Sequence, residues 1–219
     1  MERSSYVEAI EQIQGALRPF LKEKGFRVRG RTFNRATEDG LTQVVNMQMG
    51  ASDPPGTTYI PGLRENLHGL FTVNLGVYVP EVARHHGRGE AASWVQDYHC
   101  CVRSRLGEAC GEQKDLWWQA RFEDAIVSDL RRRLEVGGFP FLERYSSRDK
   151  IVSEWSDRSD NMGTSGPPRI VLAIILAERD EKDRARELLA QQVLETRNPG
   201  HPDYVRKLAD RLKLGRLDS

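Results

Sequence analysis

A cluster of basic side chains between residues 22 and 35 is the first feature with the potential for chemistry. Within GFRVRGRTFNR, Arg27, Arg29 and Arg31 occupy alternate positions, so an extended strand would project them from one face. Guanidinium groups are planar donor forks that suit carboxylates and phosphates. Phe33 follows on the same predicted face, and exposed aromatic rings stack on bases. The stretch therefore predicts a binding strand, with a nucleic acid as one alternative ligand.

Histidines and cysteines form a second group of chemically capable residues. The potential metal ligands within residues 85–110 are His85, His86, His99, Cys100, Cys101 and Cys110. Zinc sites usually contain two pairs of ligands, each pair separated by two to four residues. Adjacent strand residues point to opposite faces, and His99 with Cys101 has no matching second pair. We therefore expect no metal site and no cofactor, and the odd cysteine count favours reduced thiols.

Signatures of catalysis are missing from the sequence. Neither a G-x-S-x-G elbow nor a phosphate-binding loop is present, and the glycine-bearing GRGEAAS segment at 87–93 has no lysine. A pair of carboxylates in unknown geometry leaves little trace in a sequence. We expect a protein that is not an enzyme, and an enzyme with an unrecognised site remains an alternative.

The elements that must position these residues begin with a helix and a hairpin. An apolar stripe at steps of three and four predicts a helix from Ser5 that ends at Gly25. The period then changes to two, which predicts strands over 26–35 and 41–49 joined at Asp39-Gly40. A register with Ala36 opposite Leu41 separates an apolar face from a polar one. It places Thr32 opposite Val45 on the apolar face, and Gln48 and Asn46 opposite arginines on the polar face.

A strand over 70–80 extends this polar face. Its apolar residues alternate with polar ones, so pairing alongside the hairpin would continue both faces. Asparagine is disfavoured in the middle of a strand, yet two occur here, which indicates a surface that hydrogen-bonds a partner or a covering segment. The Pro- and Gly-rich loop 50–69 is a candidate cover or second contact. The predicted binding residues are Arg29, Arg31, Phe33, Asn46, Gln48, Thr72, Asn74 and Tyr78.

The rest of the chain completes an α+β fold. Residues 98–107 and 115–120 are predicted fourth and fifth strands, which makes an antiparallel sheet of four to five strands packed on helices. A helix after Arg121 should end at Gly137-Gly138, and Trp117-Trp118 should divide between rim and core. A small all-helical C-terminal segment follows, with a helical-hairpin pattern and helices over 169–179, 183–196 and 202–213. We place an α+β domain at 1–145, a helical segment at 146–219 and a linker near 156–168.

Composition limits the partners and the location. The formal net charge is +1, so overall charge does not favour a nucleic acid or a membrane surface. No apolar run is long enough to span a membrane, and the N-terminus has no apolar signal core. These features predict a cytoplasmic protein.

Several stretches together resemble a known family. They are GFRVRGRTFNR, DGLTQVVNMQMG, LFTVNLGVYVP, CCVRSRLG, DLWWQ and GGFPFLER, and they span about residues 20–145. In order and spacing they resemble a bacterial family of uncharacterised proteins, domain of unknown function 4304. The resemblance implies a cytoplasmic bacterial protein with an α+β domain, and it brings no established activity and no catalytic residues.

The sequence thus favours a non-enzymatic binding or interaction module that uses the polar sheet face and the 50–69 loop. Its expected partner is another protein. The first alternative is a nucleic-acid-binding protein that uses the basic strand Arg27–Arg35, and the second is the enzyme with an unrecognised site.

Overall fold

The computed structural model describes residues 5–51, 66–86, 89, 93–156 and 168–217. It divides into two compact units that are each discontinuous in sequence. Unit 1 comprises Met1–Arg35, Val44–Leu75 and Ser104–Phe141, and unit 2 comprises Ala36–Gln43, Gly76–Arg103 and Leu142–Ser219. The predicted linker near 156–168 lies almost entirely outside the described residues, and the predicted division of the chain after residue 145 stays a prediction.

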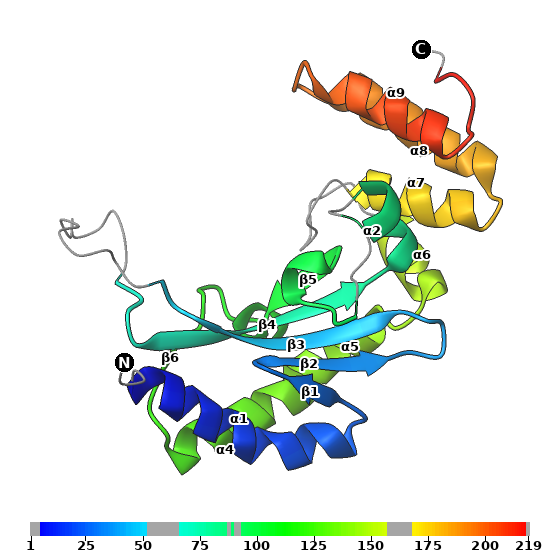
Figure 1. Cartoon of the computed structure of the whole chain (residues 1–219). Coiled ribbons are helices and arrows are strands. Elements are labelled where there is room, and N and C mark those ends of the chain that lie inside the picture. Colours follow the sequence, from blue (N-terminus) through cyan, green and yellow to red (C-terminus); the bar gives the residue numbers. More distant parts are fainter. Residues whose placement is uncertain (1–4, 52–65, 87–88, 90–92, 157–167, 218–219) are drawn as a thin grey trace. The chain divides into compact units, whose positions relative to one another are not determined.

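An antiparallel sheet confirms the predicted α+β class. Its path is β1 (Arg27–Arg29), β2 (Thr32–Ala36), β3 (Thr42–Met49), β4 (Leu70–Tyr78) and β5 (Val102–Arg105). A short sixth strand, β6 (Trp118–Gln119), pairs with the start of β4, where Phe71 lies opposite Trp118. Consecutive strands are neighbours along the path, as in a meander (Figure 1).

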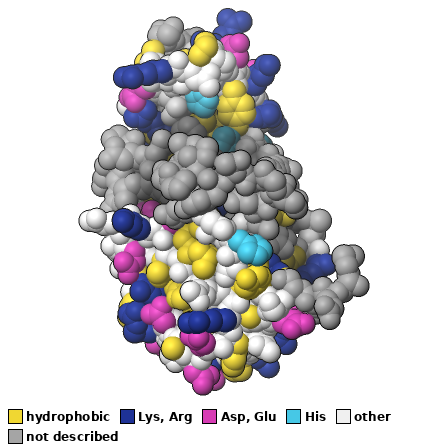
Figure 2. Space-filling view, turned by 90° about the vertical axis from the view of Figure 1, so that its left-hand side faces the viewer, with side chains coloured by type: hydrophobic (Ala, Val, Ile, Leu, Met, Phe, Trp, Pro, Cys, Tyr) yellow, Lys and Arg dark blue, Asp and Glu magenta, His cyan; other side chains and the backbone are white. Residues whose placement is uncertain are grey.

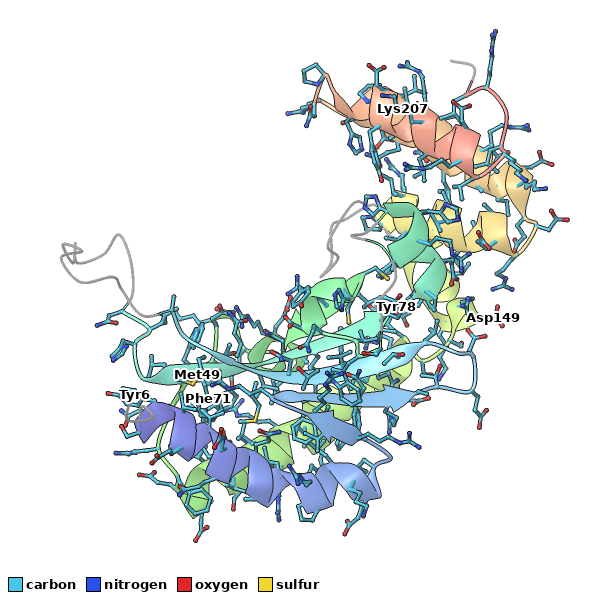
Figure 3. The ribbon with its side chains drawn as sticks, viewed as in Figure 1. Tyr6, Met49, Phe71, Tyr78, Asp149 and Lys207 are labelled. Atoms are coloured by element: carbon cyan, nitrogen blue, oxygen red, sulfur yellow. The ribbon has the colours of Figure 1, made fainter. Side chains whose placement is uncertain are left out.

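The core of unit 1 lies between the sheet and two helices. Helix α1 (Ser5–Glu23) and helix α4 (Asp124–Arg133) lie side by side against one face of the sheet (Figure 1). The predicted stripe of α1 is buried, because its apolar residues recur on one side of the helix. Phe71 from β4 is fully buried on the helix side of the sheet (Figure 3). Gly25, with φ of +84°, ends the α1 segment as predicted.

The predicted strand 26–35 is wrong, because the chain reverses within it. Gly30 has φ of +56°, and the two-residue turn Gly30-Arg31 joins β1 to β2, which pair antiparallel. Arg29 therefore lies opposite Thr32, and Val28 lies opposite Phe33. Glycine is the residue that adopts positive φ without strain at the first position of such a turn. The arginines at 27 and 31 consequently do not share one continuous strand face.

The predicted register of the next hairpin is wrong by one residue. The amide of Thr37 donates to the carbonyl of Leu41 over 2.9 Å, and Met47 donates to Arg31 over 3.0 Å. These bonds indicate that Thr32 lies opposite Asn46. The reason is the connection, which is a three-residue loop that ends at Gly40 with φ of +73° instead of a four-residue loop.

The Gly137-Gly138 pair does not end a helix, contrary to the prediction. Helix α4 continues through a π segment, η2 (Leu134–Gly138), into α5 (Phe139–Arg144). A Cβ atom on Gly137 would lie 2.6 Å from Cys110 Sγ, so only glycine fits against the helix α3 (Leu106–Ala109) and the residue after it. The two glycines thus serve close packing, and the predicted fourth strand is shorter than 98–107 because α3 begins at Leu106.

Unit 2 contains most of the remaining helices. They are α2 (Pro80–His86), the 3₁₀ turn η1 (Asp97–His99), α6 (Arg148–Ser156), α7 (Pro168–Glu178), α8 (Lys182–Glu195) and α9 (His201–Arg211). The last three match the predicted C-terminal helices within a few residues. Residues 170–176 of α7 are all buried, as expected for a helix that is apolar on all sides. Within the described residues, no helix is long and apolar enough to cross a membrane.

An ion-paired arginine ties three segments of unit 2 together. Arg148, at the start of α6, donates through Nε and Nη2 to the two carboxylate oxygens of Glu81 over 2.6 and 2.8 Å. It also donates to the backbone carbonyl of Asp39 and lies 3.1 Å from that residue's carboxylate. Glu81 is only 5% exposed, so its charge depends on this bidentate contact.

Candidate functional site

A ladder of side-chain hydrogen bonds crosses four strands of the sheet within unit 1. Arg105 Nη1 on β5 donates to Asn74 Oδ1 on β4 over 2.7 Å. Asn74 Nδ2 lies 3.5 Å from Asn46 Oδ1 on β3, and Asn46 Nδ2 donates to Thr32 Oγ1 on β2 over 2.9 Å. Gln48 on β3 joins through Oε1, which accepts from Asn74 over 2.8 Å and from Arg105 over 3.3 Å. We call these five residues the polar ladder.

The ladder has one direction because Arg105 has donors only. A guanidinium cannot accept, so Asn74 must present its carbonyl oxygen to Arg105 and its amide nitrogen to Asn46 and Gln48. The same reasoning passes to Asn46, whose oxygen faces Asn74 and whose nitrogen faces Thr32. The two mid-strand asparagines are therefore explained by cross-strand bonds that begin at an arginine.

Burial differs among the residues of the ladder, and Asn46 is half-buried. Thr32 is 2% exposed and Asn74 is 4% exposed, so these residues belong to the interior. Gln48 is exposed, and the side chain of Arg105 is 29% exposed. Thr32 and Asn74 are therefore structural, whereas Gln48 and Arg105 are accessible enough to offer atoms to a partner.

The segment that follows β5 holds Arg105 from the other side. The guanidinium lies over the ring of the half-buried Trp117, with the Cζ atom 5.4 Å from the ring centroid. Its Nε lies 3.7 Å from the Asp115 carboxylate, which is a loose ion pair. The Arg105 amide donates to Glu108 Oε2 over 3.3 Å, and Ser104 Oγ donates to the same oxygen over 2.7 Å. The anchored backbone of Arg105, the side-chain amides of Asn74 and Gln48 and the ring of Trp117 together fix the position of the guanidinium.

Two donor groups at this end are available to a ligand. The Arg105 contacts use Nη1 and Nε, and the Gln48 contacts use Oε1 alone. In the part of the chain that the structure describes, no partner engages Arg105 Nη2 or Gln48 Nε2. We call Gln48, Arg105 and Trp117 the ladder end. It presents two fixed donors beside an aromatic ring.

The predicted binding residues separate into three groups. Asn46, Gln48 and Asn74 do meet on one face, and Arg29, which is exposed opposite Thr32, lies on that face too. Thr72 is buried at 1% exposure.

The remaining three do not join them. Phe33 follows Thr32 on β2, so it projects to the opposite face, where it is 1% exposed. The predicted placement of Phe33 beside the arginines is therefore wrong. Arg31 lies in the β1–β2 turn, half-buried. Tyr78, labelled at the end of β4 in Figure 3, belongs to unit 2 and is 6% exposed.

The sequence prediction missed three residues of the polar ladder and the ladder end, namely Thr32, Arg105 and Trp117. Thr32 was assigned to the apolar face by the register error of one residue. Arg105 stands in CCVRSRLG, within the predicted fourth strand, whose polar side was not part of the predicted binding face. The two mid-strand asparagines are the available signal, because buried amides require hydrogen-bond partners.

The basic stretch loses the aromatic component of a nucleic-acid surface. Arg35 donates to the carbonyl of Lys24 over 2.9 Å and lies over the Phe26 ring, so it is used within unit 1. Phe33 cannot stack on a base because it is buried. On the described part of the face drawn in Figure 2, basic and acidic side chains are interspersed. The nucleic-acid alternative thus keeps exposed basic side chains such as Arg27 and Arg29.

The cysteines and histidines do not assemble into a metal centre within the described residues. Burial raises the pKa of Cys101 to about 12, and burial also raises the pKa of Cys100. Gly76 leaves room for Cys100, because a Cβ at that position would lie 2.7 Å from Cys100 Sγ. These two thiols are packing groups.

One histidine cluster joins helices of unit 2. The ring nitrogen Nδ1 of His86 on α2 hydrogen-bonds the hydroxyl of Tyr204 on α9. The Tyr204 ring also stacks on His201 at 5.9 Å, and Arg211 lies 6.0 Å from its centroid. Burial lowers the pKa of His86, and the charges of His201 and Arg211 lower it further. This cluster joins α9 to α2, and the lowered pKa of His86 favours its neutral form.

Comparison with known families confirms the resemblance over part of the chain. Residues 64–144 match the family described as Domain of unknown function (DUF4304). The matched range contains β4, β5 and β6, and hence Asn74, Arg105 and Trp117, whereas Thr32, Asn46 and Gln48 precede it. Searches of curated proteins and of solved structures each found no match.

Proposed function

We propose that this protein is a non-enzymatic binding module whose partner is another protein and whose contact surface includes the ladder end. One observation carries the proposal: Arg105 is fixed by Asn74, Gln48 and the Trp117 ring, while its Nη2 has no partner among the described residues. A donor held in one geometry loses little conformational entropy on binding. Arginine and tryptophan are also the residues that most often dominate protein interfaces.

The comparison of Arg105 with Arg133 supports the choice of site. Arg133 in α4 also combines several contacts, but Asp129 and Glu112 both receive its donors at 2.9 Å. Among the described residues, the one ion pair of Arg105 is the loose contact with Asp115 at 3.7 Å. The charge of Arg105 is therefore the less compensated of the two, and it sits beside the exposed Gln48.

Site-specific crosslinking tests the proposal. A photoreactive benzoylphenylalanine replaces Gln48 in one variant, and it replaces Gln119, an exposed residue of β6, in the control. Irradiation in the producing cells should join a discrete protein to the Gln48 variant, and an Arg105→Lys change in the same chain should reduce that product. Identical products from both positions, or none from position 48, would refute a protein interface at the ladder end. The 50–69 loop, most of which lies outside the described residues, stays a predicted second contact.

A further inference from the structure

We infer that the ladder end binds a single carboxylate group of the partner, and this inference rests on the proposed function. The two available groups, Arg105 Nη2 and Gln48 Nε2, are both donors, so their ligand must be an acceptor. The Gln48 amide cannot reverse, because its oxygen accepts from Asn74 and Arg105 at once. The site therefore excludes ligands whose recognition depends on a donor group.

The positive charge of Arg105 favours a carboxylate over a neutral acceptor. A guanidinium binds a carboxylate more strongly than a neutral carbonyl, because both partners are ionised. Asp115 balances Arg105 incompletely, since it is 54% exposed and 3.7 Å from Nε. The edge of the guanidinium that carries Nη2 can therefore bind an anionic oxygen in addition to that of Asp115.

The neighbouring acids argue against a polyanion. Asp115 lies 3.7 Å from Arg105 Nε, and the Glu108 carboxylate accepts from the Arg105 backbone amide. These acids repel any anion, but they repel a phosphate or a nucleic-acid backbone, which carries more negative charge, more strongly than a single carboxylate, which can displace the loose Asp115 contact. The ring of Trp117 beside the guanidinium offers an apolar surface for the aliphatic part of the ligand.

Nuclear magnetic resonance titration of the full chain with small probes tests the ligand class. The probes are acetyl-Gly-Gly-Gly with a free C-terminal carboxylate, acetyl-Gly-Glu-Gly-amide, acetyl-Gly-Gln-Gly-amide and inorganic phosphate. The signals are the Gln48 side-chain amide, the Arg105 Nε–H and the Trp117 indole N–H. We expect saturable shifts with a carboxylate peptide and weaker ones with the glutamine peptide and phosphate. The first two peptides distinguish a chain terminus from an acidic side chain.

A matched pair of variants separates binding from folding. Gln48→Glu keeps an oxygen that accepts from Asn74 and Arg105, but it replaces the outward donor by an acceptor and adds a negative charge. We expect it to weaken carboxylate binding about tenfold or more while the Asn74 amide signal is retained. Gln119→Glu makes the same change of charge at another exposed position of unit 1 and should bind as the wild type does.

The outcomes distinguish the ligand class from the proposed function. Equal or tighter binding of phosphate or of the glutamine peptide, no shift with any probe, or unchanged binding by Gln48→Glu would each overturn the carboxylate inference. If crosslinking at position 48 still yields a discrete protein, the binding module stands and only its ligand chemistry is wrong. If crosslinking also fails, the proposed function falls with it.

Discussion

Arg105 Nη1 lies 2.7 Å from Asn74 Oδ1, and this bond orients every amide of the polar ladder. Because the guanidinium only donates, the carbonyl of each successive asparagine faces β5 and its nitrogen faces β2. The bond joins a half-exposed charge to a residue that is 4% exposed. The interior of the sheet thereby holds a surface group in place.

The direction of the ladder predicts the effect of Asn74→Asp. The new carboxylate still accepts from Arg105, but it cannot donate to Asn46 or Gln48, so Asn46 Oδ1 loses its donor and Gln48 Oε1 keeps the contact with Arg105 alone while both oxygens face a carboxylate. We expect the free energy of unfolding at pH 7 to fall by about 1–3 kcal/mol, despite the added ion pair. Urea denaturation measures this, with Gln119→Glu as the control for added charge. An increase in stability would show that the ladder has no preferred direction.

Two glycines in helical segments should respond oppositely to alanine. At Gly137 a Cβ would lie 2.6 Å from Cys110 Sγ and 2.8 Å from the Ala109 carbonyl, so Gly137→Ala should destabilise the protein by about 1–3 kcal/mol. At Gly15 in α1 nothing lies within 4 Å, so Gly15→Ala should stabilise it by about 0.5–1 kcal/mol. Thermal unfolding of the two variants provides the comparison. A neutral or stabilising Gly137→Ala would contradict the close approach to α3.

The Arg148–Glu81 pair should be strongly coupled. Arg148→Met leaves the buried Glu81 carboxylate without its guanidinium, and we expect a loss of about 3–5 kcal/mol in the free energy of unfolding. Adding Glu81→Gln to that variant should recover part of the loss, because the buried group is then neutral. A double-mutant cycle in urea measures the coupling. Additive single effects would mean that the two side chains do not depend on each other.

The lowered pKa of His86 predicts that the free energy of unfolding decreases as the pH falls. Burial, with the charges of His201 and Arg211, lowers its folded pKa, whereas the unfolded chain has a pKa near 6.5. The unfolded state therefore binds more protons as the pH falls below 6.5, and the contribution of His86 is lost as the pH passes through the lowered folded pKa.

The measurement compares urea unfolding of the wild type and His86→Gln at pH 7.5 and 5.5. Glutamine can accept a hydrogen bond from Tyr204 without titrating, so the variant should lose less stability over this interval. Equal losses would assign the acid sensitivity to other groups.

The thiols predict slow alkylation in the folded protein. Burial raises the pKa of Cys100 and Cys101, the latter to about 12, and burial raises that of Cys110 as well. Because the thiolate is the nucleophile, iodoacetamide at pH 7.5 should modify the native chain far more slowly than the unfolded chain. Mass spectrometry counts the labels. Rapid labelling of Cys100 or Cys101 under native conditions would contradict their placement in the core.

The elements that sequence could predict were those with a strong and uninterrupted period. The apolar stripe of α1, the alternation of β4 and the apolar run of α7 each extend over enough residues to predict the element and its apolar face. The burial of the polar side of β4, at Thr72 and Asn74, does not follow from the alternation. The turn at Gly30-Arg31 was missed because a glycine within an alternating run is compatible with either a strand or a hairpin.

The candidate site depended on information that local patterns do not contain. A single extra residue in the predicted loop before Leu41 moved Thr32 to the wrong face, since side chains alternate with a period of two. Arg105 is 31 positions from Asn74 in the chain, and only the pairing of β5 with β4 brings them together. The asparagines could be recognised as unusual from sequence, but their partner could not.

The π segment Leu134–Gly138 determines how the following helix, α5, is rotated about the helix axis. A π turn contains one residue more than an α turn, so α5 begins about 100° further round than an uninterrupted helix would place it. Phe139 depends on that offset, because its ring lies 5.7 Å from Phe20 and 6.1 Å from Phe26. Removing one residue here, such as the exposed Val136, would restore an ordinary α-helix and turn Phe139 away from both rings. The length of this segment is therefore constrained more tightly than its composition, and insertions or deletions should be tolerated here less than substitutions.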